Sequence, residues 1–100
     1  MALFNITHER YYNNSVNFTG DGTTKTFTIT TAALDPIPAA KADIDIYVNG
    51  KEVSVGNYAY NNSSGVITFS GNTNNTDILE SDGAPKNGLI ITVIQINAED

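Results

Sequence analysis

Residues 43–53 read DIDIYVNGKEV and give the clearest local prediction of structure in this chain. Alternate residues from Ile44 to Val48 are β-branched and apolar, and the residues between them are polar or aromatic. This period of two is typical of a strand with one buried face. Asn49 and Gly50 follow at once, and Asn-Gly between strand-like runs is the strongest short-range hairpin signal. The stretch therefore predicts a β-hairpin, which serves as the fixed point of the fold.

Other runs of strand-forming residues lie on both sides of this hairpin. They occur at 15–19, 25–31, 57–60, 66–70 and 88–97. The turn formers Gly20, Asp21 and Gly22 separate the first two runs, so we expect those runs to pair as a second hairpin. Residues 32–42 contain two prolines, which remove main-chain donors, and this segment predicts a crossover between sheets.

About seven short strands, with turn signals every ~8–12 residues, predict an all-β fold. We expect a single antiparallel, Ig-like β-sandwich at residues 14–100, preceded by an N-terminal arm at residues 1–13. The composition agrees, because Thr favours strands while Asn and Gly favour turns.

Charge and composition restrict the classes of function. The net charge is −6 with only five basic residues, which argues against nucleic-acid binding and against an anionic membrane surface. The chain has no cysteine, which removes disulfides and thiolate metal sites. It has no signal-peptide pattern and no apolar run approaching ~18 residues, so we expect neither secretion nor a membrane span.

The run GLIITVIQIN at 88–97 is apolar on both faces. Its side chains divide into Leu89, Ile91 and Val93 on one face and Ile90, Ile94 and Ile96 on the other. A strand with one wet face should alternate, and this one does not. Either the second face is covered by the arm or by the long loop at 71–88, or it lies in a subunit interface.

The first 13 residues carry apolar side chains without a clean strand or helix period. These side chains are Leu3, Phe4, Ile6, Tyr11 and Tyr12. Two interpretations stay open: a short helical turn or edge strand on the domain's own sheet, or an arm that docks on a neighbouring subunit. Together with Ile90, Ile94 and Ile96, these five residues are the candidate interface residues.

Catalytic and metal-binding chemistry has little support in the sequence. His8 is the only histidine, and no nucleophile can be assigned to it. Asp77, Glu80 and Asp82 share one polar loop, but their spacing does not match an EF-hand, so a solvated acidic loop is favoured over a calcium site. We therefore predict no catalytic residues, no metal and no cofactor, and we expect the protein not to be an enzyme.

Tyr47, Tyr58 and Tyr60 are the remaining candidates for a contact surface, because tyrosine is enriched at interfaces. Tyr58 and Tyr60 are two residues apart and should share one face of a strand. A contact patch and packing in the core are both open for them.

The order of these motifs resembles a small β-sandwich module of bacteriophage virion proteins. The resemblance rests on GDGTTKTFTIT at 20–30, IDIYVNG at 44–50, NYAY at 57–60, GVITF at 65–69 and LIITVIQI at 89–96. It covers residues 15–97. The chain departs from the common form at 71–88, where a long loop replaces a short Pro/Gly turn.

The resemblance implies a non-enzymatic structural protein of the virion that assembles around a symmetry axis. Because the chain runs by itself from Met1 to Asp100, a separate component is favoured over a segment of a long fibre. We expect a capsid decoration (cement) protein that binds the assembled particle through the arm and the apolar strand face. The expected partners are the major capsid protein or tail and neck proteins, together with further copies of the chain.

Two alternatives stay open for this function. One is a tail, neck, baseplate or fibre accessory subunit, and the other is a receptor- or carbohydrate-binding adhesin module. The expected location is the virion, after synthesis in the host cytoplasm.

Overall fold

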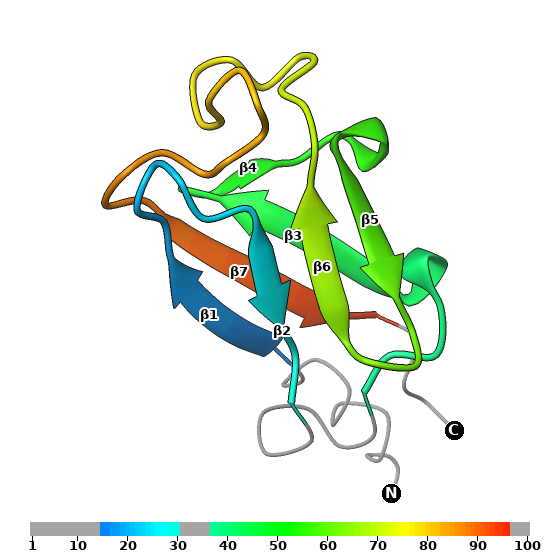
Figure 1. Cartoon of the computed structure of the whole chain (residues 1–100). Helices are drawn as coiled ribbons and strands as arrows, with labels where there is room; N and C mark the ends of the chain where they lie inside the picture. The colour runs from blue at the N-terminus through cyan, green and yellow to red at the C-terminus, as the bar shows by residue number, and fades with distance from the viewer. Residues whose placement is uncertain (1–14, 31–36, 97–100) are drawn as a thin grey trace, which may run out of the picture.

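The computed structural model describes residues 15–30 and 37–96 of the chain. These residues form seven strands in two antiparallel sheets that pack face to face (Figure 1). The four-stranded sheet has the order β1 (Ser15–Thr19), β7 (Ile90–Gln95), β3 (Ile44–Val48) and β4 (Lys51–Glu52). The three-stranded sheet has the order β2 (Thr26–Thr28), β6 (Val66–Phe69) and β5 (Tyr58–Asn61). The predicted all-β sandwich of about seven strands is confirmed.

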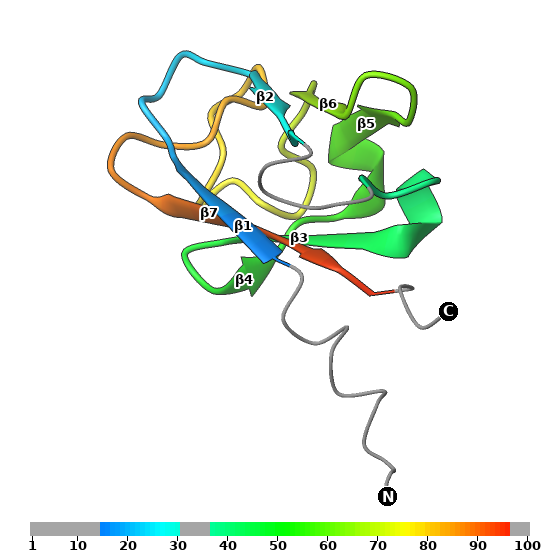
Figure 2. The same ribbon diagram turned by 90° about the horizontal axis from the view of Figure 1, so that it is seen from below.

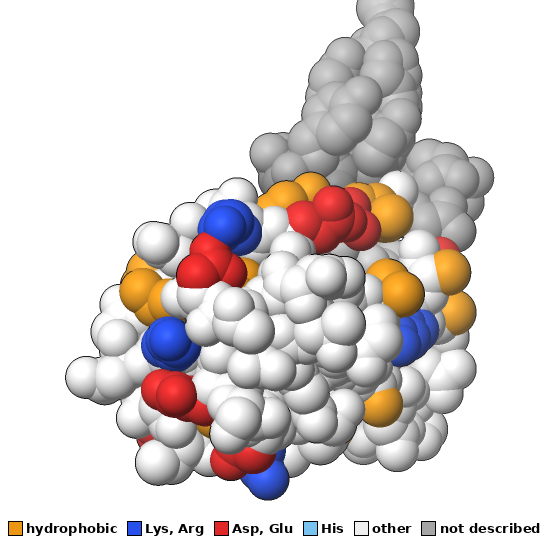
Figure 3. Space-filling model, turned by 90° about the horizontal axis from the view of Figure 1, so that it is seen from above, with side chains coloured by type: hydrophobic (Ala, Val, Ile, Leu, Met, Phe, Trp, Pro, Cys, Tyr) orange, Lys and Arg blue, Asp and Glu red, His pale blue; other side chains and the backbone are white. Residues whose placement is uncertain are grey.

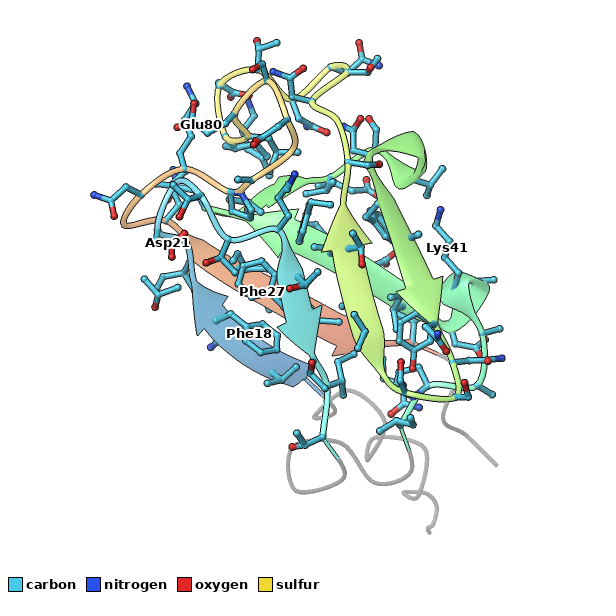
Figure 4. The ribbon with its side chains drawn as sticks, viewed as in Figure 1. Phe18, Asp21, Phe27, Lys41 and Glu80 are labelled. Carbon is cyan, nitrogen blue, oxygen red and sulfur yellow. The ribbon has the colours of Figure 1, made fainter. Side chains whose placement is uncertain are left out.

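The core lies between the two layers, which Figure 2 shows in a view from below. The four-stranded sheet contributes Ile44, Ile46, Val48, Ile91 and Val93, and the three-stranded sheet contributes Phe27, Tyr58, Ile67 and Phe69. Phe27 links the layers, with its ring centroid 5.3 Å from that of Phe18 and 5.8 Å from that of Phe69. Figure 4 shows Phe18 and Phe27 side by side between β1 and β2. The alternation read from the sequence thus decides which side chains enter the core.

The central hairpin is formed as predicted. β3 pairs with β4, and the two residues between them, Asn49 and Gly50, have φ angles of 54° and 82°. Positive φ at both central positions is the signature of a type I′ turn. Ile44, Ile46 and Val48 are all buried, so the register of this hairpin fixes the inner face of the four-stranded sheet.

The expected second hairpin is wrong, because β1 and β2 lie in different sheets. β1 pairs with β7, and β2 pairs with β6. The Gly-Asp-Gly segment is instead a connection across one end of the sandwich, where the N–H of Gly20 donates to Leu89 O at 2.8 Å. Gly20 has no room for a side chain, since a Cβ would lie 2.6 Å from Lys86 O. Docking against the segment before β7 therefore replaces strand pairing at this turn.

The remaining connections follow the sequence more closely. The proline-containing segment leads from one sheet to the other, as expected, and ends in the 3-10 turn η2 (Lys41–Asp43). A second 3-10 turn, η3 (Val55–Asn57), joins β4 to β5. The long loop at 71–88 closes one end of the sandwich, and Ile78 and Leu79 are buried in the core, so they anchor the middle of this loop.

Candidate interaction surface

The outer face of the four-stranded sheet carries the apolar residues that the sequence assigned to the second face of β7. Ile91 and Val93 point into the core and are fully buried, while Ile90 and Ile96 are each 46% exposed. Ile94, between them, is half-buried. We call Ile90, Ile94 and Ile96 the isoleucine row.

The register places the isoleucine row in the middle of the sheet. Ile94 lies opposite Ser15 of β1 on one side and Asp45 of β3 on the other. Thr92, in the middle of β7, is flanked in the same way by Asn17 and Tyr47. Paired residues of antiparallel strands share a face, so this surface is an apolar row framed by polar and acidic side chains.

A shallow apolar pocket lies beside this surface, at the edge of β3 that β4 leaves unpaired. It has a volume of about 420 Å³ and is lined by Lys41, Ala42, Ile44, Asp45 and Val55. Val55 is 66% exposed, because η3 turns it outward. Lys41 holds this turn in place by donating to Val55 O at 2.7 Å and to Tyr58 O at 2.8 Å (its side chain is labelled in Figure 4). The pocket and the exposed Val55 therefore lie beyond Asp45, on the side of β3 away from β7.

A second, more polar hollow lies on the outer side of the three-stranded sheet. It has a volume of about 470 Å³ and is lined by Ala40, Lys41, Ala59, Tyr60, Asn61, Asn62, Val66 and Thr68. The hydroxyl of Tyr60 donates to Pro38 O at 2.6 Å, and Asn62 Nδ2 donates to Ala39 O at 2.7 Å. These bonds tie the hollow's polar groups to the segment before η2.

The Gly-Asp-Gly turn is built around one carboxylate. Asp21 accepts hydrogen bonds from the main-chain N–H and the hydroxyl of both Thr23 and Thr24. These bonds, with those of Thr24 contributing most, hold the pKa of Asp21 far below its ordinary value. The arrangement stabilises a turn.

The acidic residues of the 71–88 loop are spread apart. Asp77 forms an ion pair with Lys51, whose hydrogen bond lowers the pKa of the Asp77 carboxyl. Within residues 15–30 and 37–96, no group of three His, Asp or Glu side chains is placed to hold a metal ion. On the loop end of the molecule, side chains of both charges are interspersed among polar groups (Figure 3).

The structure separates the three tyrosines that the sequence offered as a contact patch. Tyr58 is 4% exposed and packs in the core, with its pKa raised chiefly by burial. Tyr60 packs against the core from the same face of β5, as expected, and Tyr47 lies half-buried on the opposite sheet. Core packing therefore explains Tyr58, and the three do not form one surface.

Part of the candidate site lies outside the described residues. This holds for the arm residues Leu3, Phe4, Ile6, Tyr11 and Tyr12, and for His8. The isoleucine row was found from its sequence pattern. Val55 was missed, because Val53 and Val55 alternate as in a strand, and this pattern does not predict that a 3-10 turn will expose Val55.

In comparisons with known proteins, no family model matches the chain, and neither a curated protein nor a solved structure matches it. The described residues contain no helix that is long and apolar enough to cross a membrane. The fold is thus assigned from its own geometry as a small all-β domain with two antiparallel sheets packed together.

Proposed function

We propose that this protein is a non-enzymatic structural component of a bacteriophage virion, and that it acts as a capsid decoration protein. The observation that carries the proposal is the isoleucine row on the outer face of the four-stranded sheet. The virion assignment rests on the order of motifs in the sequence. The mechanism is adhesion: the sheet face, together with residues 1–13, binds neighbouring proteins of the assembled particle.

The energy available from this face is modest for one copy. Full burial of an isoleucine side chain contributes about 1.5–3 kcal/mol, and Ile90 and Ile96 still expose 46% of their surface. Each therefore contributes about 1 kcal/mol when a partner covers it. A symmetric shell multiplies such contacts, because every further copy is bound by a surface that is already assembled.

The acidic side chains around the isoleucine row determine which kind of partner surface fits it. Asp45 lies on the same face as the isoleucine row, and Glu52 lies opposite Tyr47 in the register of β3 and β4. A partner surface with an apolar centre and a basic margin is complementary to this arrangement. Such a partner belongs to the major capsid protein in the leading form of the proposal, and to a tail or neck protein in its alternative.

The test substitutes Ile94→Lys in the sheet face and measures occupancy of purified particles by quantitative mass spectrometry. Thr68→Lys is the matched control, because Thr68 is exposed on the central strand of the other sheet, where it lines the polar hollow and lies away from the isoleucine row. We expect at least about a tenfold loss of occupancy for Ile94→Lys and no loss for Thr68→Lys, since a charge in an apolar interface costs more than about 1.4 kcal/mol. Equal occupancy of both variants contradicts the proposal.

Copy number separates the two locations on the particle. A shell protein is present on the order of hundreds of copies, whereas a tail or neck subunit is present in about a dozen or fewer. Deletion of residues 1–12 tests the arm: unchanged occupancy would remove the arm from the mechanism and leave the sheet face alone.

A carbohydrate-binding module is the second candidate, and the polar hollow favours it. Tyr60, Asn61, Asn62 and Lys41 line that hollow with one aromatic ring and several hydrogen-bonding groups. A glycan array separates the candidates. Binding that Asn61→Ala abolishes supports the module, and an array without binding leaves the structural role.

A further inference from the structure

The sheet edges of the sandwich differ in how well they are protected against pairing with a strand of another chain. β4 is two residues long and charged, and β2 is three residues long. The edge of β5 is covered by Lys41, which donates to Tyr58 O at 2.8 Å. β1, at the other edge of the four-stranded sheet, has five residues and carries none of these devices within residues 15–19. Figure 1 shows β1 at the margin of its sheet.

The pairing of β1 with β7 shows which main-chain groups of β1 face outward. Gly20 N donates to Leu89 O, so the antiparallel pattern makes Phe18 and Val16 the residues that bond to β7. Ser15, Asn17 and Thr19 alternate with them, and their N–H and C=O groups point away from the sheet. No hydrogen bond of these groups to a described residue is present. With respect to residues 15–30 and 37–96, β1 therefore has three donors and three acceptors in a row without a partner.

The side chains of β1 suit an added strand. Val16 and Phe18 pack against the core but are only half-buried, so the core is incompletely covered at this margin. Ser15, Asn17 and Thr19 are exposed and uncharged. The strand contains no Lys, Pro or inward charge, which are the features that usually prevent edge-to-edge pairing.

We propose that a second copy of this chain binds here, with the two β1 strands pairing antiparallel about a two-fold axis at Asn17. The two four-stranded sheets then form one continuous eight-stranded sheet. Ser15 faces Thr19 of the other copy, and Asn17 faces Asn17. In this register Ser15, Asn17 and Thr19 form hydrogen-bonded pairs across the axis. All six outward main-chain groups of each copy are then paired.

The sequence of β1 fits itself in this register. Val16 lies opposite Phe18 of the other copy in the close, non-hydrogen-bonded position, and a β-branched residue beside an aromatic one is a favourable cross-strand pair. On the outer face, Ser meets Thr and Asn meets Asn, with no like charges. This self-complementarity selects a second copy over an unrelated peptide, and a two-fold contact closes without forming a fibre.

The same axis brings further surface together. Figure 1 shows β2 on the same side of the sandwich as β1, so a two-fold axis perpendicular to the sheet directs the two β2 strands toward each other. The β1 edge can pair in this way whatever role the isoleucine row has. A dimer through β1 can form whether or not the protein belongs to a virion.

The first test measures association of the full chain by sedimentation equilibrium up to millimolar concentration. We expect a species of twice the 10.7 kDa monomer mass. Asn17→Lys places two like charges opposite each other at the axis and should weaken the dimer at least tenfold. Thr68→Lys adds the same charge at an exposed site on the other sheet and should leave the dimer unchanged.

The second test traps the register. The chain has no cysteine, so Asn17→Cys provides a single thiol. Hydrogen-bonded antiparallel pairs have Cα atoms about 5.5 Å apart, within the range that a disulfide spans. Mild oxidation should therefore cross-link Asn17→Cys rapidly and Thr68→Cys only slowly.

Either of two results overturns the proposal. One is a monomer at every concentration up to millimolar, and the other is an oligomer that Asn17→Lys weakens no more than Thr68→Lys does. A dimer that dissociates with Asn17→Lys but persists with Ile94→Lys separates this edge contact from the adhesion surface of the proposed function.

Discussion

Removing the buried amide of Asn57, by Asn57→Ala, should lower the free energy of unfolding more than removing the amide of an exposed asparagine. Asn57 is 2% exposed and is the last residue of η3, directly before β5. Its Nδ2 donates to Thr73 O at 2.8 Å and to Asn75 Oδ1 at 2.9 Å, and its Oδ1 accepts from Thr73 N at 3.0 Å. Asn75, itself buried, continues the network by accepting from Ser54 N and donating to Glu52 O. These bonds fasten the 71–88 loop to the segment between β4 and β5.

The expected magnitude follows from the three bonds that the alanine removes. A hydrogen bond contributes about 0.5–1.5 kcal/mol net, and buried groups left without a partner cost more. Thr73 is exposed, so water satisfies part of what is lost. We therefore expect the free energy of unfolding to fall by about 2–4 kcal/mol, a large part of the about 5–15 kcal/mol typical of a domain.

The assay is urea unfolding followed by far-UV circular dichroism, with thermal melting as a second readout. A loss of this size lowers Tm by roughly 4–8 °C per kcal/mol in a domain near this length. Asn62→Ala is the matched control, because its side chain makes one exposed hydrogen bond, to Ala39 O. It should cost only about 0.5 kcal/mol. A loss below about 1 kcal/mol for Asn57→Ala, no larger than that of Asn62→Ala, would contradict a stabilising role for this buried network.

Three further predictions concern the turns and the surface. Gly83→Ala should destabilise the fold by about 2–4 kcal/mol in urea unfolding, because Gly83 has φ of 97° and a Cβ would lie 2.5 Å from a main-chain nitrogen; Gly56→Ala, with nothing within 4 Å, should be neutral. Asp21 has a lowered pKa when folded, so its stabilisation is present above the unfolded value of about 3.9 and is lost as pH falls below it. In thermal melts at a series of pH values, the Tm of Asp21→Asn should fall less steeply at acid pH than that of the wild-type chain. An equally steep fall would contradict this role of Asp21. Lys51→Met should raise the pKa of Asp77 in an NMR titration and should leave the free energy of unfolding almost unchanged, because an exposed ion pair contributes little to stability.

The sequence predicts the central hairpin well because two independent local signals agree there. Alternation places Ile44, Ile46 and Val48 on one face, and Asn49 with Gly50 supplies the positive φ angles of the turn. Each signal acts within a few residues, so no knowledge of the rest of the chain is needed. The same holds for the two-faced pattern of β7.

The pairing of β1 could not be predicted, because alternation does not name a partner strand. The Gly20 turn resembles a hairpin connection, yet it docks against the segment before β7. What decides between the outcomes is the fit of Gly20 against Lys86 and Leu89, which are more than 60 residues away in the chain. A local sequence pattern does not predict contacts between residues so far apart.

The buried asparagines were missed for a related reason. Asn57 falls in the strand-like run at 57–60 and Asn75 falls in the polar loop at 71–88, and neither position predicts a buried amide. Burial of both depends on their meeting across 18 positions of sequence, where the two amides bond to each other. Val55 is exposed because it lies in a 3-10 turn, and the residues around it do not predict that turn.

The most direct test of binding through the isoleucine row is the amount of this protein on purified phage particles, measured for the wild-type chain and for a variant of that row. We expect the wild-type chain and Thr68→Lys to saturate the particle, on the order of hundreds of copies for a decorated shell, and Ile94→Lys to be depleted at least about tenfold. Absence of the wild-type chain from the particles, or full occupancy by Ile94→Lys, would contradict it.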